Sequence, residues 1–397
     1  MNKSVIITLF LLICNSCMSY IYWDPTFGGQ LVKILMYLCV IYVIFQKKLK
    51  SPRDSKLFPY VLCFTFIPFL SIIPAMLVHN QSFSACMYGY QMHLMYLFFP
   101  LLYYLKVKPK DILKVFIVLG ITWCLIEIVQ QILYPQVWFA TRMETAEKEL
   151  EIRNGIYRYN VAGREFGLIM LFYCFSQYLK NKKILYLIGF VLGIIGVYLL
   201  ATRQIMVATV ICIVYALYAC NKIKLSSLVI LIGIGYLIYI NSSLLFGDFV
   251  EMTERVDKDY IRFIAYEFYG LKYNDGNLLQ ILLGNGDPAR ESNYQIEIKR
   301  YEEQGLWRAD IGVVGLYSLY GLFYVVAIVA FFIYCFRNRK YIDLYLQMYL
   351  VFMLSTCIML YHFGGTYERI AIMSFITYLI DKSITKNKND NAISQNP

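Results

Sequence analysis

Residues 311–336, IGVVGLYSLYGLFYVVAIVAFFIYCF, form a long apolar stretch that contains no charged side chain. A helix of about 20 apolar residues spans the hydrocarbon core of a bilayer, because it rises about 1.5 Å per residue. Backbone groups in lipid must be hydrogen-bonded within the protein, and a helix does this within one segment. The stretch therefore predicts a membrane-spanning helix.

The whole chain shares this apolar character. Of its 397 residues, 59% are hydrophobic and 16% are charged, and the mean hydropathy is +0.55. Soluble domains average about 25% charged residues. The composition therefore favours one polytopic membrane domain over residues 1–397 rather than two or three soluble domains.

Apolar runs of spanning length recur along the sequence and predict an all-α membrane bundle of about twelve transmembrane helices. We expect the run nearest the N-terminus to be an uncleaved first span. The runs lie near 4–22, 31–46, 57–78, 85–105, 112–134, 165–179, 184–201, 204–220, 225–245, 311–336, 341–361 and 367–381.

The connections between these runs alternate in lysine content. Stretches such as QKKLKSPRDSK (46–56) and KVKPKD (106–111) are rich in lysine, whereas ATRQ (201–204) and HFGGTYER (362–369) contain none. Lysine and arginine accumulate in the cytoplasmic loops of membrane proteins. The alternation therefore predicts a multi-pass protein of the plasma membrane with both termini in the cytoplasm.

Two segments on the predicted outer face are long, residues 135–164 and 246–310. Loops of more than about 12–15 residues are usually functional or disordered. Both contain many aromatic residues, and the second has helix-like periodicity in DFVEMTERVDKDYIRFIAYEFYG (248–270). We expect them to form ordered caps, the larger one a helical outer-face loop domain.

Arginine and lysine are sorted between the two predicted faces. The inner face carries three arginines and eighteen lysines, and the outer face eleven arginines and four lysines. Topology requires only positive charge, so it does not explain the outer arginines. The planar guanidinium fits phosphate and carboxylate oxygens. We therefore expect an anionic ligand at the outer face, with ion pairs to outer acids as the alternative.

Several outer residues are candidates for such a site. Arg203 begins an apolar run and has few acids near it in the sequence, which favours a place facing a central cavity. Arg255 and Arg262 are seven residues apart on one helical face, with Asp259 between them. The two arginines would bind one diphosphate together, or they would flank Asp259 as a series of ion pairs.

Two further motifs carry weaker signals. The glycines of LLGNGDP (282–288) permit positive φ, which suits either an anion-binding turn or a helix C-cap. Asp310, just before the long apolar run, is a candidate for chemistry or a helix cap.

Several classes of chemistry are not indicated. No metal-ligand spacing, P-loop or dinucleotide fingerprint occurs in the sequence. We expect no metal, no cofactor, no nucleotide and no nucleic acid partner.

At ATRQ (201–204), GNG (284–286) and RADIGVVGLYSLYG (308–321), the chain resembles the bacterial O-antigen and capsular polysaccharide polymerases, whose superfamily includes the O-antigen ligases. The likeness covers roughly residues 150–335 in short motifs and the whole chain in topology. It implies a GT-C-like bundle in the bacterial inner membrane. Ligases commonly carry a histidine before the GxxG helix. This chain has Arg308-Ala309-Asp310 there, which favours a polymerase.

The resemblance implies a metal-independent glycosyltransferase whose substrate is an oligosaccharide repeat unit on undecaprenyl diphosphate. The partners implied are membrane lipid, a chain-length regulator and a flippase. On this basis Asp310, His362 and Glu368 are the candidate bases for the acceptor hydroxyl, in that order. The candidate diphosphate-binding residues are Arg203, Arg164, Arg255, Arg262, Arg158, Arg308 and Arg369.

Two alternatives remain open at the level of sequence. An O-antigen ligase would transfer finished glycan from the lipid carrier to an acceptor and would share the arginines. A flippase for lipid-linked oligosaccharides has a similar number of spans, but it would show two similar halves and no long outer loop.

Overall fold

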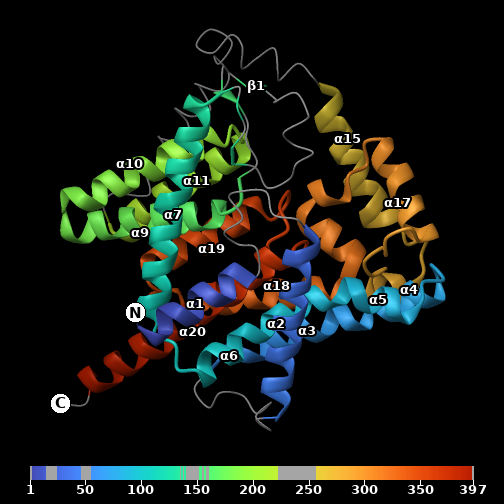
Figure 1. Cartoon of the computed structure of the whole chain (residues 1–397), viewed down its shortest axis with the longest axis horizontal. Helices are drawn as coiled ribbons and strands as arrows, with labels where there is room; N and C mark the ends of the chain where they lie inside the picture. Colours follow the sequence, from blue (N-terminus) through green and yellow to red (C-terminus); the bar gives the residue numbers. More distant parts are fainter. Residues whose placement is uncertain are drawn as a thin grey trace.

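The computed structural model describes residues 2–14, 25–45, 55–134, 136, 138–139, 152–153, 156–157, 161–221 and 256–395. These residues are almost entirely helical, which confirms the all-α class (Figure 1). The described residues also include one small sheet, in which the two-residue strand β1 (Ile152–Arg153) pairs antiparallel with the two-residue strand β2 (Ile156–Tyr157).

The helices of the first half are mostly short. They are α1 (Lys3–Cys14), α2 (Pro25–Phe45), α3 (Phe58–Leu70), α4 (Ile72–Leu77), α5 (Phe83–Tyr90), the 3₁₀ segment η1 (Gln91–Leu97), α6 (Phe98–Tyr104), α7 (Pro109–Ile132), α9 (Arg164–Asn181), α10 (Ile184–Leu199) and α11 (Arg203–Ala219).

The second half combines short helices with two long ones. Its elements are α15 (Val256–Glu267), the π-helical turn η2 (Phe268–Lys272), α16 (Leu278–Leu283), α17 (Asn293–Glu303), the 3₁₀ turn η3 (Arg308–Asp310), α18 (Gly312–Arg337), the 3₁₀ turn η4 (Arg339–Tyr341), α19 (Leu344–Thr356) and α20 (Tyr367–Gln395).

Three helical segments are long and apolar enough to cross a membrane: Phe58–Leu77, Pro109–Ile132 and Gly312–Arg337. The first joins α3 and α4, and the other two are α7 and α18. Other described apolar helices are shorter. The chain therefore has the character of a membrane protein.

The run predicted at 85–105 is divided into α5, η1 and α6 rather than forming one α-helix. Pro100 contributes to this division, because it has no N–H to donate to the carbonyl of Tyr96 four residues earlier. That carbonyl accepts the backbone amide of Phe98 and, at 3.1 Å, the hydroxyl of Ser374 on α20. A proline thus leaves a backbone acceptor that ties this segment to α20.

Helix α9 packs against α7, α10 and α19. Its contact with α7 is unusually close, because a β-carbon at Gly167 would lie 2.3 Å from the Trp123 ring, and one at Gly120 would lie 2.5 Å from the Phe166 carbonyl oxygen. Small residues allow helices in lipid to approach at this distance. The start of α9 is therefore held firmly in the bundle.

Helix α18 is broken at Gly321, whose φ of +77° is not helical. The turn after α16 packs at this break, and Gly284 is the C-cap of α16 with φ +81°. The backbone amides of Asn285 and Gly286 donate to the carbonyls of Ser318 and Leu319 at 2.8–3.0 Å. Since these amides are bonded within the protein, the glycine turn is a helix cap rather than an anion site.

The described part of the predicted outer loop 246–310 is largely helical. Figure 1 shows α15 and α17 on one side of the molecule and α9, α10 and α11 on the other. The region is tied to the segment after α4, because the side-chain amide of Gln81 donates to the carbonyl of Asp287 at 3.1 Å and its oxygen accepts from the Ala289 amide at 2.7 Å.

Candidate functional site

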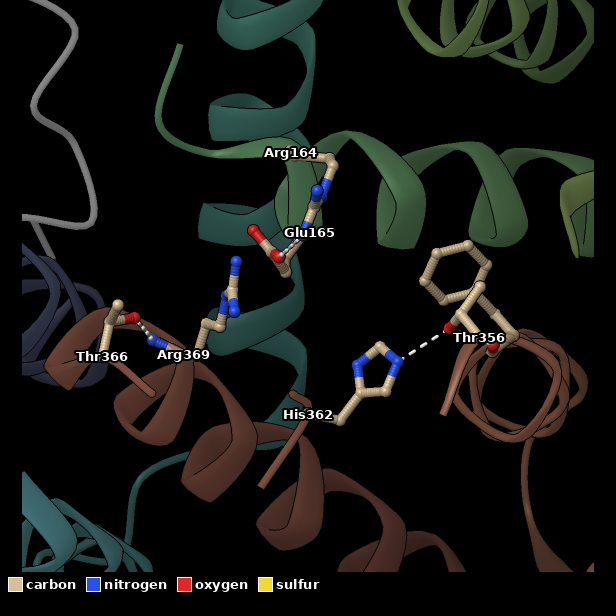
Figure 2. A network of polar contacts seen from close by, with 7 residues as sticks. Arg164, Glu165, Thr356, His362, Thr366 and Arg369 are labelled. Atoms are coloured by element: carbon tan, nitrogen blue, oxygen red, sulfur yellow. Dashed lines mark hydrogen bonds and ion pairs between the residues drawn. The ribbon is translucent and has the colours of Figure 1, made fainter. Parts of the chain in front are cut away.

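Polar side chains from distant parts of the sequence converge on one small cavity (Figure 2). The cavity lies between the first turns of α9 and α20, the helix α19, and the turn that joins α19 to α20. Its volume is about 10 Å³, the space of about one water molecule. A larger ligand would require the surrounding side chains to move. The lining residues are Arg164, Glu165, Tyr349, Leu360, Tyr361, His362, Arg369, Ile372 and Met373.

The first turn of α9 is placed by Gly163. This residue is the N-cap of the helix and has φ +103°, in the left-handed region that glycine adopts without strain. The chain therefore turns sharply before α9, and Arg164 and Glu165 begin the helix at the cavity.

Arg164 and Glu165 form an ion pair with Nη2 and Oε1 2.9 Å apart, and their side chains are 22% and 15% exposed. The Nε of Arg164 is buried and has no hydrogen-bond partner among the described residues. A buried N–H without a partner is costly, so this donor is available to a ligand.

Arg369 approaches the same cavity from α20. The hydroxyl of Thr366 accepts a hydrogen bond from the backbone amide of Arg369 at 3.3 Å, which helps to begin the helix. Glu368 and Glu165 both interact electrostatically with Arg164 and Arg369. Two positive and two negative side chains therefore form one partly buried cluster.

His362 lies between this cluster and α19. Its Nε2 is 2.7 Å from the hydroxyl oxygen of Thr356, and Figure 2 shows its other ring nitrogen turned away from that bond. Burial, followed by the positive charges of Arg164 and Arg369, lowers the pKa of His362 to about 3, with Glu165 opposing. The imidazole is therefore neutral at physiological pH and too weak a base to take a proton from a sugar hydroxyl.

The other candidate arginines with described side chains are not among the cavity-lining residues. Arg203 is exposed at the first position of α11, and Arg262 is half-buried on α15. Arg308 is buried, and it donates from Nη1 to the Tyr294 hydroxyl at 3.1 Å. Its carbonyl accepts from the hydroxyl of Tyr361 at 2.6 Å, so one residue joins Arg308 to the cavity wall.

Asp310 is exposed in η3 and does not line the cavity. The N-cap of α18 is Ile311, with no side-chain cap bond, so Asp310 does not serve as the predicted cap. Arg158 and Arg255 lie outside the described residues, so their proposed roles stay predictions.

Sequence reasoning did not select Glu165, Tyr349 or Thr356. Glu165 follows Arg164 directly, and an adjacent acid looks like an ordinary surface ion pair in a sequence. Tyr349 and Thr356 lie in an apolar run, where the expected role is packing. Only the packing of α19 on α9 brings Tyr349 to the cavity.

Over the described ranges, no three histidine, cysteine, aspartate or glutamate side chains are grouped closely enough to hold a metal ion. The polar groups at the site are guanidinium groups, carboxylates, an imidazole and hydroxyls. This set suits binding of an anion and transfer of a proton.

No protein-family model matches the chain, and no curated protein matches it.

Proposed function

We propose that this chain polymerises undecaprenyl-diphosphate-linked repeat units into O-antigen or capsular polysaccharide at the outer face of the bacterial inner membrane. The observation that carries the proposal is the convergence of Arg164, Arg369 and His362 on one cavity. All three lie in segments that the charge pattern assigns to the outer face. Anionic lipid-linked glycan is a substrate class that fits such a site.

Each polar group then has a role in transfer. Arg164 and Arg369 bind the diphosphate and stabilise the negative charge that develops on it. The acceptor hydroxyl oxygen attacks the anomeric carbon of the donor sugar. The bond from that carbon to the diphosphate breaks, and undecaprenyl diphosphate leaves with the electron pair.

Glu368 is the proposed base that receives the hydroxyl proton. Of the three candidates from the sequence, it interacts with both arginines of the cavity. Neither Asp310 nor Glu368 is a lining residue, but Asp310 is not among the charges that act on these two arginines. His362 has its pKa lowered to about 3. Burial and the neighbouring charge of Glu165 raise the pKa of Glu368 to about 7, whereas, despite burial, Arg164 holds the pKa of Glu165 at about 2, so Glu368 is the stronger base of the two carboxylates.

The membrane arrangement is part of the proposal. Twelve spans in a GT-C-like bundle with both termini in the cytoplasm would place the starts of α9 and α20 at the outer face. The lysine-rich connections support this orientation. A flippase would deliver the lipid-linked unit, and a chain-length regulator would act with the polymerase.

The test is deletion of the gene in its host and complementation with wild type, Arg164→Ala, Arg369→Ala or Arg203→Ala. Surface polysaccharide is then resolved on a gel, and membrane levels of each variant are checked by immunoblot. We expect the deletion to convert a ladder into single capped units. Wild type should restore the ladder, whereas the Arg164 and Arg369 variants should not.

Each other outcome has a definite meaning. Loss of all glycan from the lipid core, with long chains still built on the carrier, would point to a ligase. An unchanged ladder in the deletion strain would rule out both transfer functions. Restoration by Arg203→Ala would agree with its exposed position outside the cavity, whereas failure at normal membrane levels would require a role for Arg203 away from this cavity.

A further inference from the structure

The hydrogen bonds of Thr356 determine which nitrogen of His362 carries the proton. The Thr356 hydroxyl donates to the carbonyl of Phe352 at 2.7 Å, and a carbonyl can only accept. A hydroxyl has a single hydrogen, so its oxygen can only accept in its 2.7 Å contact with His362 Nε2. Nε2 must therefore carry a hydrogen.

The neutral ring then has a bare nitrogen at Nδ1. His362 lines the cavity, and Figure 2 shows the nitrogen that is not bonded to Thr356 on the side of Arg369. No hydrogen bond to Nδ1 occurs within the described part of the chain. The lone pair of Nδ1 is thus presented to the cavity beside two guanidinium groups.

From this arrangement we infer that His362 is a positioning residue whose Nδ1 accepts a hydrogen bond from a hydroxyl group of the bound substrate, with Thr356 holding the ring in the tautomer that this requires. Phosphate oxygens at neutral pH are acceptors, and so they match the arginines but not Nδ1. The site is therefore divided into an anion side at Arg164 and Arg369 and a hydroxyl side at His362.

This inference rests on the proposed function for the identity of the hydroxyl. In glycan transfer it belongs to a sugar that is held beside the diphosphate, and it is not the attacking hydroxyl, whose single hydrogen goes to the carboxylate base. His362 orients the sugar through this hydroxyl and takes no proton from it.

Two substitutions of His362 separate the two ring nitrogens. Asparagine places its amide oxygen near the position of Nδ1, whereas glutamine reaches the position of Nε2 and leaves no acceptor near Nδ1. With purified protein and lipid-linked repeat unit from the native strain, His362→Asn should retain roughly ten-fold more activity than His362→Gln, the effect of about one hydrogen bond. Equal losses in both variants would overturn the inference.

Thr356 provides an independent pair of variants. Thr356→Ser keeps the hydroxyl and should behave as wild type. Thr356→Val keeps the shape of the side chain but removes the oxygen that accepts from Nε2–H. His362 is then no longer held in one tautomer, and the rate of transfer should fall. A loss that is the same for serine and valine would show that the side chain acts through packing alone.

A spectroscopic measurement keeps this inference separate from the activity. We would record ¹⁵N spectra of histidine-labelled wild type in lipid nanodiscs and assign His362 by its loss in His362→Asn. We expect a bare Nδ1 whose signal moves when the lipid-linked repeat unit is added but not when inorganic diphosphate is added. A protonated Nδ1, or a shift of the Nδ1 signal with diphosphate alone, would contradict the inference that Nδ1 accepts from a substrate hydroxyl. Absence of polymer made by wild type would instead refute the proposed function.

Discussion

Arg164 and Arg369 line the same cavity although they begin two different helices, α9 and α20, from distant parts of the sequence. Glu165 and Glu368, which neighbour them in the chain, interact electrostatically with both arginines. Each helix thus contributes one basic and one acidic side chain from its first turn. The pairing makes a compact charged cluster where the first turns of α9 and α20 meet α19.

The two arginines should not tolerate replacement by lysine. Arginine presents a planar fork to a diphosphate, whereas lysine is a point charge. Removing one charge-stabilising donor typically costs roughly 10²–10³ in rate. We expect alanine at Arg369 to lose activity in that range and lysine to recover only part of it, measured as polymer formed per unit of purified protein. Full recovery by Arg369→Lys would show that charge alone is sufficient.

Glu165 should restrain anion binding, because it occupies a nitrogen of Arg164 at 2.9 Å. Glu165→Gln removes this competitor, so we expect inorganic diphosphate to bind about ten-fold more tightly by calorimetry. The matched control is Glu267→Gln, which removes an exposed ion pair with Lys272 at 2.8 Å and should not change binding. An equal effect of both variants would indicate a general change in surface charge.

The stability of the protein should fall in acid, partly through His362. Its pKa is lowered to about 3, while an unfolded histidine has a pKa of about 6.5. The unfolded state therefore binds a proton first as the pH falls, so the stabilisation is complete above about pH 6.5 and is lost progressively toward pH 3. We expect the thermal midpoint to drop between pH 7.5 and pH 5, and to drop less in His362→Asn.

The comparison with His362→Asn isolates this residue, because burial also lowers the pKa of His79 and that contribution is common to both proteins. Parallel decreases in wild type and variant would contradict a depressed pKa at His362.

The glycine turn after α16 should be sensitive to a single methyl group. Gly284 has φ +81°, and a β-carbon there would lie 2.3 Å from the carbonyl oxygen of Leu319. Gly276 has a similar φ of +71° but nothing within 4 Å of that position. Gly276→Ala should therefore cost only the backbone strain, roughly 1–2 kcal/mol. Gly284→Ala adds a clash at the break of α18, and we expect a larger loss of thermal stability in detergent.

Similar losses in the two alanine variants would show that the α16 turn can move away from α18. The membrane level of each variant, measured before purification, would reveal a failure to fold.

The orientation can be tested with fusions. If the C-terminus is cytoplasmic, green fluorescent protein fused after residue 397 should fluoresce. Alkaline phosphatase inserted after Gly276, in the predicted outer loop, should be active. An inactive phosphatase after Gly276 together with a non-fluorescent C-terminal fusion would reverse the topology and move the charged cluster to the inner face.

Much of the fold class could be predicted because hydropathy is a local property. The charge-free run at 311–336 predicts a long apolar helix, and α18 covers Gly312–Arg337. Its break at Gly321 could not be foreseen, since the broken carbonyls are satisfied by the turn at Asn285 and Gly286 from a separate part of the chain.

The charge pattern likewise predicted that arginines on the outer face bind an anion, but not which of them lie at one site. Arg164, Arg203 and Arg369 look alike in the sequence, because each stands at the start of an apolar run. Close packing through Gly120 and Gly167 holds α9 against α7. The start of α9 then lies at the same cavity as the start of α20, while Arg203 is exposed at the start of α11.

The apolar, helical character of the chain and the distribution of its charges could be predicted, because these follow from sums over neighbouring residues. Three features emerged from the folded chain: which charges meet, which glycine amides are already bonded, and which nitrogen of His362 faces the cavity. Those outcomes depend on contacts between helices far apart in the sequence, and no local pattern encodes their geometry.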